Sequence, residues 1–170
     1  MPLLTPSKWP ASAPSWTNMT LSEFQDNFEA IDTPDSRHGA RRLALQALYW
    51  EACDAGKAPG ALENLQQGLE LSEPVFAFAE TLVLLATEHA LELEELIGAN
   101  ATHWRTDRMA RIDLIILRQT LAEILFVDDV PVRVSIDEAV ELARVFSTEQ
   151  SYAFVNGILD AVVHQKDLPV

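Results

Sequence analysis

A cluster of basic side chains near residue 40 is the part of this sequence best suited to binding a polyanion. Between Arg37 and Tyr49 the chain carries three arginines and no acidic residue. If this segment is helical, each residue turns by about 100°, which puts His38 and Arg42 on one face. Arg37 and Arg41 then lie beside them. Such a face would contact phosphates, which contribute affinity more than sequence choice. The alternative is a solvated basic turn at a helix start.

The sequence offers little for catalysis or for binding a metal. Its four histidines lack a second histidine or a cysteine three or four residues away: His38, His89, His103 and His164. Cys53 has no such neighbour either, so a zinc site is not expected. The six glycines do not cluster into a phosphate-binding loop. The carboxylates of Glu92, Glu94 and Glu95 are typical of a solvated helix face. We therefore expect no enzymatic activity, no metal and no cofactor.

The composition indicates a folded chain with an acidic surface. Of its 170 residues, 48% are hydrophobic and 22% are charged, which is enough apolar material for a core. The formal net charge of −14 disfavours a polyanionic ligand on global grounds, so any RNA-binding surface must be a local patch. One cysteine cannot form an internal disulfide, and no apolar run approaches the ~20 residues of a membrane helix. These features favour a cytoplasmic protein.

Helical patterns follow one another from Arg37 onward, and no stretch alternates like a strand, so we predict an all-α fold. Residues 1–36 hold five of the nine prolines and are predicted to be an acidic extension of a domain over 37–170. The expected helices cover Arg37 to about Gly56, Ala61–Leu71, Val75–Ile97, Thr106–Val127, a segment after Pro131, and about Thr148 to Gln165. Helix starts are expected at Ser72–Pro74, Thr106–Asp107 and Ser135–Glu138.

Other arginines are expected to have different roles. Arg118 lies inside an apolar helical segment, where an unpaired charge would be strongly destabilising. We expect a structural ion pair with Glu123 or Glu138. Three arginines spaced by three form a second basic arc: Arg105, Arg108 and Arg111. They would extend an RNA surface, although surface arginines paired with neighbours such as Asp107 are the commoner case.

Two segments carry a family pattern. The first is Arg37-His-Gly-Ala-Arg-Arg-Leu-Ala-Leu-Gln-Ala-Leu-Tyr49. The second comprises Trp104-Arg-Thr-Asp-Arg108, Ile116-Leu-Arg118-Gln-Thr-Leu-Ala-Glu123, Val130-Pro131, Ile136-Asp-Glu138-Ala-Val-Glu-Leu-Ala143 and Phe154-Val-Asn-Gly-Ile-Leu-Asp160. Together they resemble the NusB family of bacterial transcription antitermination factors. The resemblance covers residues 37–165, is strongest from Trp104 and is weakest between 55 and 100.

The resemblance implies about seven helices in two small bundles and no catalysis. Proteins of this family pair with ribosomal protein NusE, and the pair binds a single-stranded boxA element in rRNA transcripts, which supports antitermination and rRNA maturation. It also implies indirect contact with other elongation factors and RNA polymerase. Four residues match the family's basic motif: Arg37, His38, Arg41 and Arg42. Tyr49 and Asp113 match positions that meet NusE. The alternatives are a core tyrosine and a solvated acid.

Base recognition by this family requires further residues. Single-stranded RNA is bound mainly through bases that stack on aromatic side chains and hydrogen-bond at their edges. Phe154 and Asn156 are the candidates for stacking and for an edge contact, and Tyr152 is a third. Phe154 as a core residue and Asn156 as a cap of a backbone turn are the alternatives.

The sequence departs from the family pattern at several places. His38 and Gly39 stand where arginines are frequent, Leu114 replaces a frequently basic residue, and Gln150 occupies an often acidic site. With a net charge of −14, the RNA affinity of the chain alone is expected to be weak and salt-dependent. We therefore expect the heterodimer with NusE to be the competent RNA binder.

Other functions stay open. The thinned arginine motif favours a protein–protein adaptor that kept the fold and lost useful RNA affinity. A similar fold occurs in some rRNA methyltransferases, but no methyltransferase segment follows residue 170. Some family members self-associate through the RNA-binding face, so a homodimer is a further option. Finally, residues 20–35 could fold over the basic residues and mimic RNA, in which case deleting residues 1–36 would raise RNA affinity.

Overall fold

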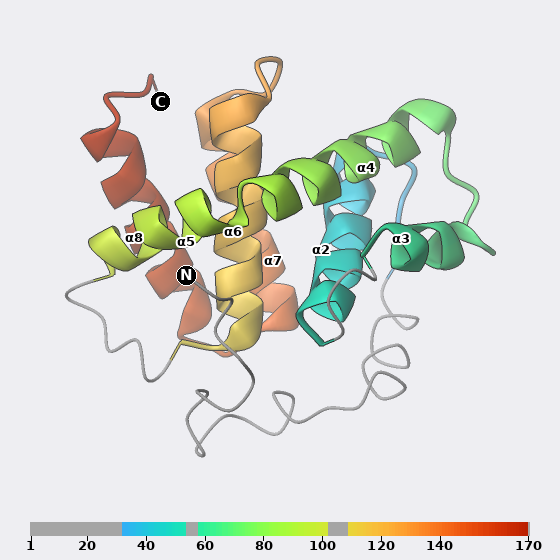
Figure 1. Cartoon of the computed structure of the whole chain (residues 1–170), viewed down its shortest axis with the longest axis horizontal. Coiled ribbons are helices and arrows are strands. Elements are labelled where there is room, and N and C mark those ends of the chain that lie inside the picture. The colour runs from blue at the N-terminus through green and yellow to red at the C-terminus, as the bar shows by residue number, and fades with distance from the viewer. Residues whose placement is uncertain (1–31, 54–57, 102–108, 170) are drawn as a thin grey trace. The chain divides into compact units, whose positions relative to one another are not determined.

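The computed structural model describes residues 32–53, 58–101 and 109–169. Within these ranges it contains seven α-helices and no strand, which confirms the predicted all-α fold (Figure 1). The helices are α2 (Arg37–Cys53), α3 (Ala58–Gln66), α4 (Glu73–Glu88), α5 (Ala90–Asn100), α6 (Arg111–Phe126), α7 (Val132–Phe146) and α8 (Ser151–Gln165). They form two compact units, one with α2, α3 and α4 and the other with α5 to α8.

The first unit is built around α2, which packs against α3 and α4. Leu45, Leu48 and Tyr49 have the i, i+3, i+4 spacing that predicts an apolar stripe along a helix, and all three are fully or almost fully buried. Leu82 and Ala79 supply buried side chains from α4. Burial of a leucine side chain contributes about 1.5–3 kcal/mol, so this stripe is a main source of the unit's stability.

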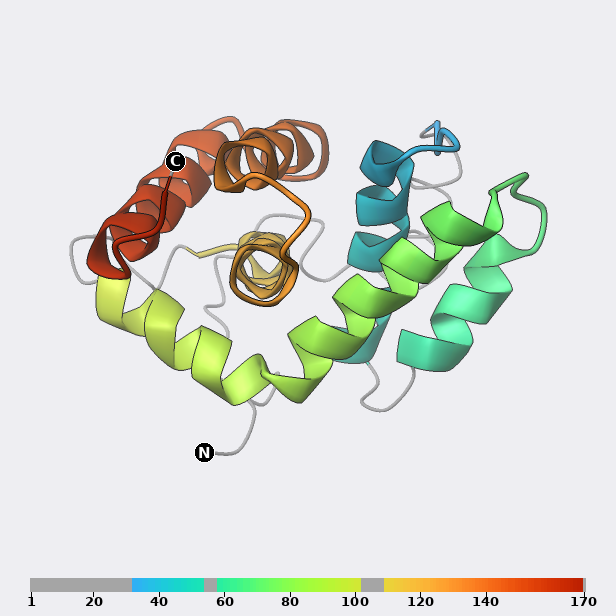
Figure 2. The ribbon, with the colours of Figure 1, turned by 90° about the horizontal axis from the view of Figure 1, so that it is seen from above.

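The second unit surrounds α6, which packs against α5, α7 and α8 (Figure 2). Figure 2 shows α6 nearly end-on, with the three other helices around it. Ile116, Leu117 and Leu121 of α6 are completely buried, as the apolar pattern of this segment predicted. The helix begins at Arg111 after an extended Ala110, and the expected cap at Thr106–Asp107 lies outside the described residues.

Two expected helix starts have different outcomes. At α4 the prediction is confirmed, because the carbonyl of Ser72 accepts hydrogen bonds from the N–H groups of Val75 and Phe76. The prediction that a helix starts at Ser135–Glu138 is wrong. The carbonyl of Pro131 accepts the first hydrogen bonds of α7, so the helix starts at Val132 and Ser135 lies inside it. The Ser135 hydroxyl instead donates to the buried Glu123 carboxylate of α6 at 2.6 Å.

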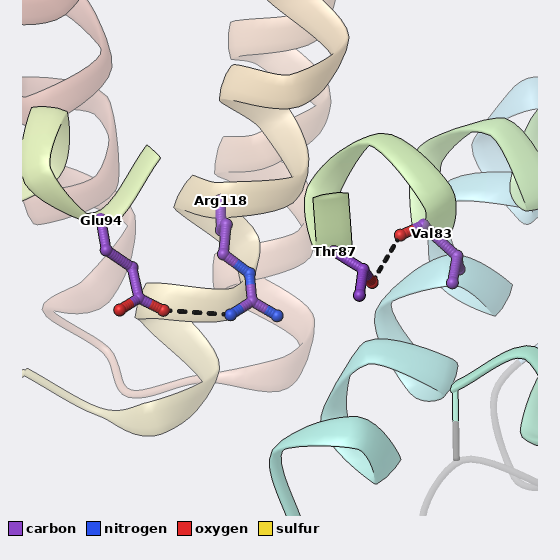
Figure 3. A network of polar contacts seen from close by, with 4 residues as sticks. All are labelled: Val83, Thr87, Glu94 and Arg118. Atoms are coloured by element: carbon purple, nitrogen blue, oxygen red, sulfur yellow. Dashed lines mark hydrogen bonds and ion pairs between the residues drawn. The ribbon is translucent and has the colours of Figure 1, made fainter. Parts of the chain in front are cut away.

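The apolar run Val75–Ile97 is not one helix, because it breaks at His89, which has φ −97° and ψ 13°. Just before the break, the Thr87 hydroxyl donates to the Val83 carbonyl at 2.7 Å (Figure 3). Bonds of this kind favour local bending of a helix. After the break, the His89 ring stacks on Phe126 with centroids 4.0 Å apart.

Within the described residues, no single helix is long and apolar enough to cross a membrane. The consecutive helices α4 and α5 meet the criterion of length and composition only when they are counted together.

Candidate nucleic-acid interface

The basic patch comprises Arg37, His38, Arg41 and Arg42 in the first turns of α2. The guanidinium groups of Arg37 and Arg41 lie over the ring of Phe78 from α4, 4.8 and 5.3 Å from its centroid. Both distances are typical of a cation–π contact. Arg37 is exposed, whereas Arg41 is only 4% exposed. Arg37 therefore reaches solvent, whereas Arg41 is held in the packing between α2 and α4.

Arg42 contacts the backbone that precedes α2. Its Nη1 donates to the carbonyl of Asp32 at 2.6 Å. Its Nε is buried and has no hydrogen-bond partner among the described residues, which carries a desolvation cost. His38 and Arg42 are both half-buried. A phosphate bound at Arg42 would therefore meet a side chain that the protein has already oriented.

Residues 32–36, here called the leading segment, directly precede the basic patch in the chain. Asp35 Oδ1 accepts hydrogen bonds from the N–H and the hydroxyl of Ser72, both at 2.8 Å. The Ser36 hydroxyl accepts a hydrogen bond from the Gly39 N–H and caps α2. A Cβ on Gly39 would lie 1.9 Å from the carbonyl oxygen of Pro34. This close approach explains why a glycine stands where the resemblance leads one to expect an arginine.

Replacement of Gly39 by alanine is expected to displace the leading segment and to lower the free energy of unfolding by about 1–3 kcal/mol. The matched control is Gly98→Ala in α5, where a Cβ meets nothing within 4 Å. There the better helix propensity of alanine should stabilise by about 0.5–1 kcal/mol. Urea unfolding of the full chain measures both changes. A Gly39→Ala variant as stable as the parent would contradict the tight contact with Pro34.

The aromatic candidates for base stacking differ in exposure. Phe154 is 9% exposed and belongs to the core, which was the alternative left open by the sequence. Tyr152, two residues earlier and in the first turn of α8, is 41% exposed. Asn156 lies within α8 and its Nδ2 donates to Asp160 Oδ2 at 2.8 Å, so it does not cap a turn. Tyr152 and Asn156 are four residues apart and share a helix face.

Arg144 of α7 is a residue that the sequence did not single out. Its guanidinium carbon lies 5.0 Å from the centroid of the Tyr152 ring. Its Nη1 also forms an ion pair with Glu141 at 2.8 Å. Because the contact with Tyr152 depends on the turn between α7 and α8, helical spacing alone could not reveal it.

The model of the NusB family matches residues 38–164. The chain belongs to the NusB family. The "Transcription antitermination protein NusB" of Geobacter sulfurreducens is 44% identical over 131 residues, which is 75% of this chain and 93% of that protein.

Solved structures of NusB proteins share the fold. The structure of T. maritima NusB has a TM-score of 0.69 and 29% identity, and the match covers 79% of this chain and 94% of that one. A structure of antitermination factors NusB and NusE in complex with dsRNA matches with a TM-score of 0.67 and 24% identity, over 76% of this chain and 96% of that one.

The two residues that the NusB resemblance assigned to contact with NusE are both buried. Tyr49 lies in the core, which favours the structural alternative. Asp113 is only 3% exposed, so it is not a solvated acid. Its carboxylate accepts hydrogen bonds from the hydroxyls of Ser147 and Ser151. Any influence of Asp113 on a partner would therefore act through the position of the α7–α8 turn.

Burial raises the pKa of Asp113 above its ordinary value, and this effect exceeds the opposing effect of its hydrogen-bond donors. These donors are the hydroxyls of Ser147 and Ser151 and the backbone of Ala110. The hydroxyl of Ser151 is also 2.8 Å from that of Thr148. This network fixes the residue immediately before Tyr152, and so it positions the exposed aromatic ring.

The buried ion pair of Arg118 forms with a different partner from the one expected. Arg118 Nη1 lies 3.1 Å from Glu94 Oε1 of α5, not beside Glu123 or Glu138 (Figure 3). A separation of five residues turns Glu123 about 140° away from Arg118 around α6, and Glu123 bonds Ser135 instead. The packing of α5 against α6 supplies the anion.

The second basic arc is described only in part. Arg105 and Arg108 lie outside the described residues, and Arg111 is half-buried at the start of α6. Within residues 32–53, 58–101 and 109–169, no group of three histidine, cysteine, aspartate or glutamate side chains is placed to hold a metal ion.

Proposed function

We propose that this chain is a transcription antitermination factor that pairs with ribosomal protein NusE and binds boxA-type single-stranded RNA in rRNA transcripts. The observation that carries this proposal is membership of the NusB family over residues 38–164. Relatives named transcription antitermination protein NusB support it. Two of them are 44% identical to this chain, and the matches cover 93% and 94% of their own length. In the solved complex of similar fold, NusB is assembled with NusE and dsRNA.

The chemistry of the described surface supports an RNA ligand in two respects. Arg37 and the half-buried Arg42 offer cations for phosphates at the start of α2. Tyr152 and Asn156 offer a stacking ring and an amide on one face of α8. Phosphate contacts and base contacts are the two components of single-strand recognition.

Several properties follow from this proposal. The chain acts without catalysis, in the cytoplasm, and meets RNA polymerase and other elongation factors indirectly. Its NusB domain starts at residue 37, where α2 begins. The net charge of −14 opposes RNA binding by the isolated chain, so NusE supplies the additional contacts.

The patch is tested by measuring the affinity of the assembled NusE pair for a labelled boxA-type RNA by fluorescence anisotropy. Arg37→Gln is expected to weaken binding roughly five- to ten-fold and to reduce the salt dependence by about one ion. Arg133→Gln, at an exposed position of α7, removes the same charge and is the control. Equal losses in both variants would mean that only net charge matters, and would contradict a phosphate contact at Arg37.

A protein–protein adaptor is the second candidate function. The burial of Arg41 and the bond between Arg42 and Asp32 favour it, because both reduce the positive charge that a phosphate can reach. An adaptor would bind NusE with full affinity while showing no measurable RNA binding in the assembled pair.

A further inference from the structure

We propose that the leading segment, residues 32–36, is an autoinhibitory clasp that competes with RNA phosphates for Arg42. The clasp is closed by the hydrogen bonds that Ser72 donates to Asp35, and it opens when RNA binds. The inference rests on the proposed RNA-binding function and adds a means of regulating the same surface.

The clasp acts on the guanidinium of Arg42. Nη1 donates to the Asp32 carbonyl at 2.6 Å, and Nε is buried with no hydrogen-bond partner among the described residues. A guanidinium binds a phosphate most strongly through two of its three nitrogens at once. In Arg42 every such pair includes either Nε or Nη1. Because a carbonyl oxygen and a phosphate oxygen are both acceptors, the leading segment and RNA compete for the same donor.

Two contacts hold the leading segment in place. Asp35 Oδ1 accepts hydrogen bonds from the N–H and the hydroxyl of Ser72, which stands immediately before α4. The carbonyl oxygen of Pro34 lies 1.9 Å from the position that a Cβ on Gly39 would occupy. The clasp therefore joins the start of α2 to the start of α4, and it closes only because residue 39 is a glycine.

The closed clasp is suited to opening. Asp35 and Ser72 are both exposed, so water can replace their hydrogen bonds with little loss of free energy. The buried Nε of Arg42 carries a desolvation cost that no hydrogen bond within the described residues offsets. Rearrangement of the guanidinium toward a phosphate would relieve this cost. The closed state is thus held by weak contacts and opposed by a buried donor.

The leading segment also weakens the electrostatic attraction of the basic patch. It adds the exposed carboxylates of Asp32 and Asp35 next to three arginines, of which Arg41 is only 4% exposed. Nearby carboxylates lower the positive potential that a polyanion meets. The sequence raised RNA mimicry by acidic side chains of residues 20–35. Within the leading segment, the Asp35 carboxylate instead contacts Ser72, and a backbone carbonyl contacts Arg42.

The test measures the affinity of the full chain, assembled with NusE, for a labelled boxA-type RNA by fluorescence anisotropy. Asp35→Ala removes the acceptor of both Ser72 bonds and is expected to tighten binding roughly 3- to 10-fold, about the net value of one hydrogen bond. Glu73→Gln removes an exposed carboxylate next to Ser72 and keeps the clasp residues, so it is the charge-matched control. It should change affinity by less than about two-fold.

A second variant leaves the charge unchanged. Ser72→Ala removes the hydroxyl bond to Asp35 and keeps the backbone bond, so a smaller gain in RNA affinity is expected. Circular dichroism verifies that each variant is folded, and Ser72→Ala tests the clasp if Asp35→Ala is unfolded. Unchanged affinity in the folded variants would overturn the proposal. Weaker binding would also overturn it, because the leading segment would then orient Arg42 for RNA.

A double-mutant cycle isolates the role of Arg42. If the clasp acts through this side chain, Asp35→Ala gains nothing in an Arg42→Gln background, because the contested donor is absent. An equal gain in both backgrounds would mean that only the net charge matters, and the clasp would be wrong.

Hydrogen exchange of the Ser72 amide shows directly whether the clasp opens. This N–H donates to Asp35 in the closed state, so it should exchange faster once boxA-type RNA is added to the assembled pair. Unchanged or slower exchange would contradict opening by RNA.

The same experiments separate the clasp from the proposed function. If the parent pair binds RNA and Asp35→Ala binds no more tightly, the clasp is wrong and RNA binding by the pair stands. If neither the parent pair nor the Asp35→Ala pair binds RNA, the proposed function and the clasp are both overturned.

Discussion

Replacement of Arg118 by alanine is expected to lower the free energy of unfolding by about 3–5 kcal/mol, the usual cost of breaking a buried ion pair from one side. The guanidinium of Arg118 is almost completely buried against Glu94, whose side chain is itself largely covered. Alanine removes the cation and leaves the carboxylate in a poorly solvated place. It also leaves a cavity beside α6, which adds to the loss. Urea unfolding followed by circular dichroism measures the change.

Two controls make this expectation specific. Arg133→Ala removes an exposed arginine from α7 and should change stability by less than about 0.5 kcal/mol. The double variant Arg118→Met with Glu94→Gln removes both charges and should recover most of the loss, because no uncompensated charge stays buried. A double variant as unstable as Arg118→Ala would show that volume, rather than the ion pair, determines the effect.

Replacement of Asp113 by alanine is the second large change, with an expected loss of about 2–4 kcal/mol. The carboxylate accepts hydrogen bonds from Ser147, Ser151 and the backbone of Ala110, and without it these buried or half-buried donors lose their acceptor. Asp128→Ala, at an exposed turn position, is the matched control and should be nearly neutral. Equal stability of both variants would contradict the role of the network in joining α6 to the α7–α8 turn.

The same carboxyl group makes a contribution that depends on pH. Burial raises the pKa of Asp113 above the usual 3.8, so the folded state binds this proton more tightly than the unfolded state does. The contribution of Asp113 to stability is therefore greatest in acid and falls as the pH rises from about 3.8 through the raised pKa. Asp113→Asn cannot titrate at this position. The unfolding free energy of the parent relative to this variant should therefore fall as the pH rises. A difference that is constant, or that moves in favour of the parent as the pH rises, would contradict the raised pKa.

Features that depend on local chemistry could be predicted from the sequence. The stripe of Leu45, Leu48 and Tyr49 is buried, and Ser72 starts α4, because helical periodicity and capping involve residues within one or two turns. The burial of Ile116 within α6 follows from an apolar pattern on all sides of one helix. Such features require no knowledge of which helices meet.

Features that depend on contact between distant segments could not be predicted. Glu94 pairs with Arg118 because α5 packs against α6, and no spacing rule links residues 24 positions apart. Phe78 reaches two arginines of the basic patch for the same reason. The break at His89 was hidden because the apolar run contains neither glycine nor proline at that point.

The candidate site shows the same division. The sequence predicted that basic residues begin α2, but it could not show that the leading segment approaches Gly39 and bonds Arg42. It identified Tyr152, Phe154 and Asn156 as candidates within one motif, but it could not show that Tyr152 is exposed and Phe154 is buried. Exposure is a property of the packed unit, because it depends on what the other helices cover.

The most direct test of the central claim is the affinity of this chain for a labelled boxA-type RNA, measured by fluorescence anisotropy at low and moderate salt with and without its own NusE. An antitermination factor of the NusB family with a net charge of −14 should bind tightly only when NusE is present. The chain alone should bind weakly and lose that binding as salt rises. Equal affinity with and without NusE would contradict the account, and so would association with NusE without any RNA binding, which is the result expected of an adaptor.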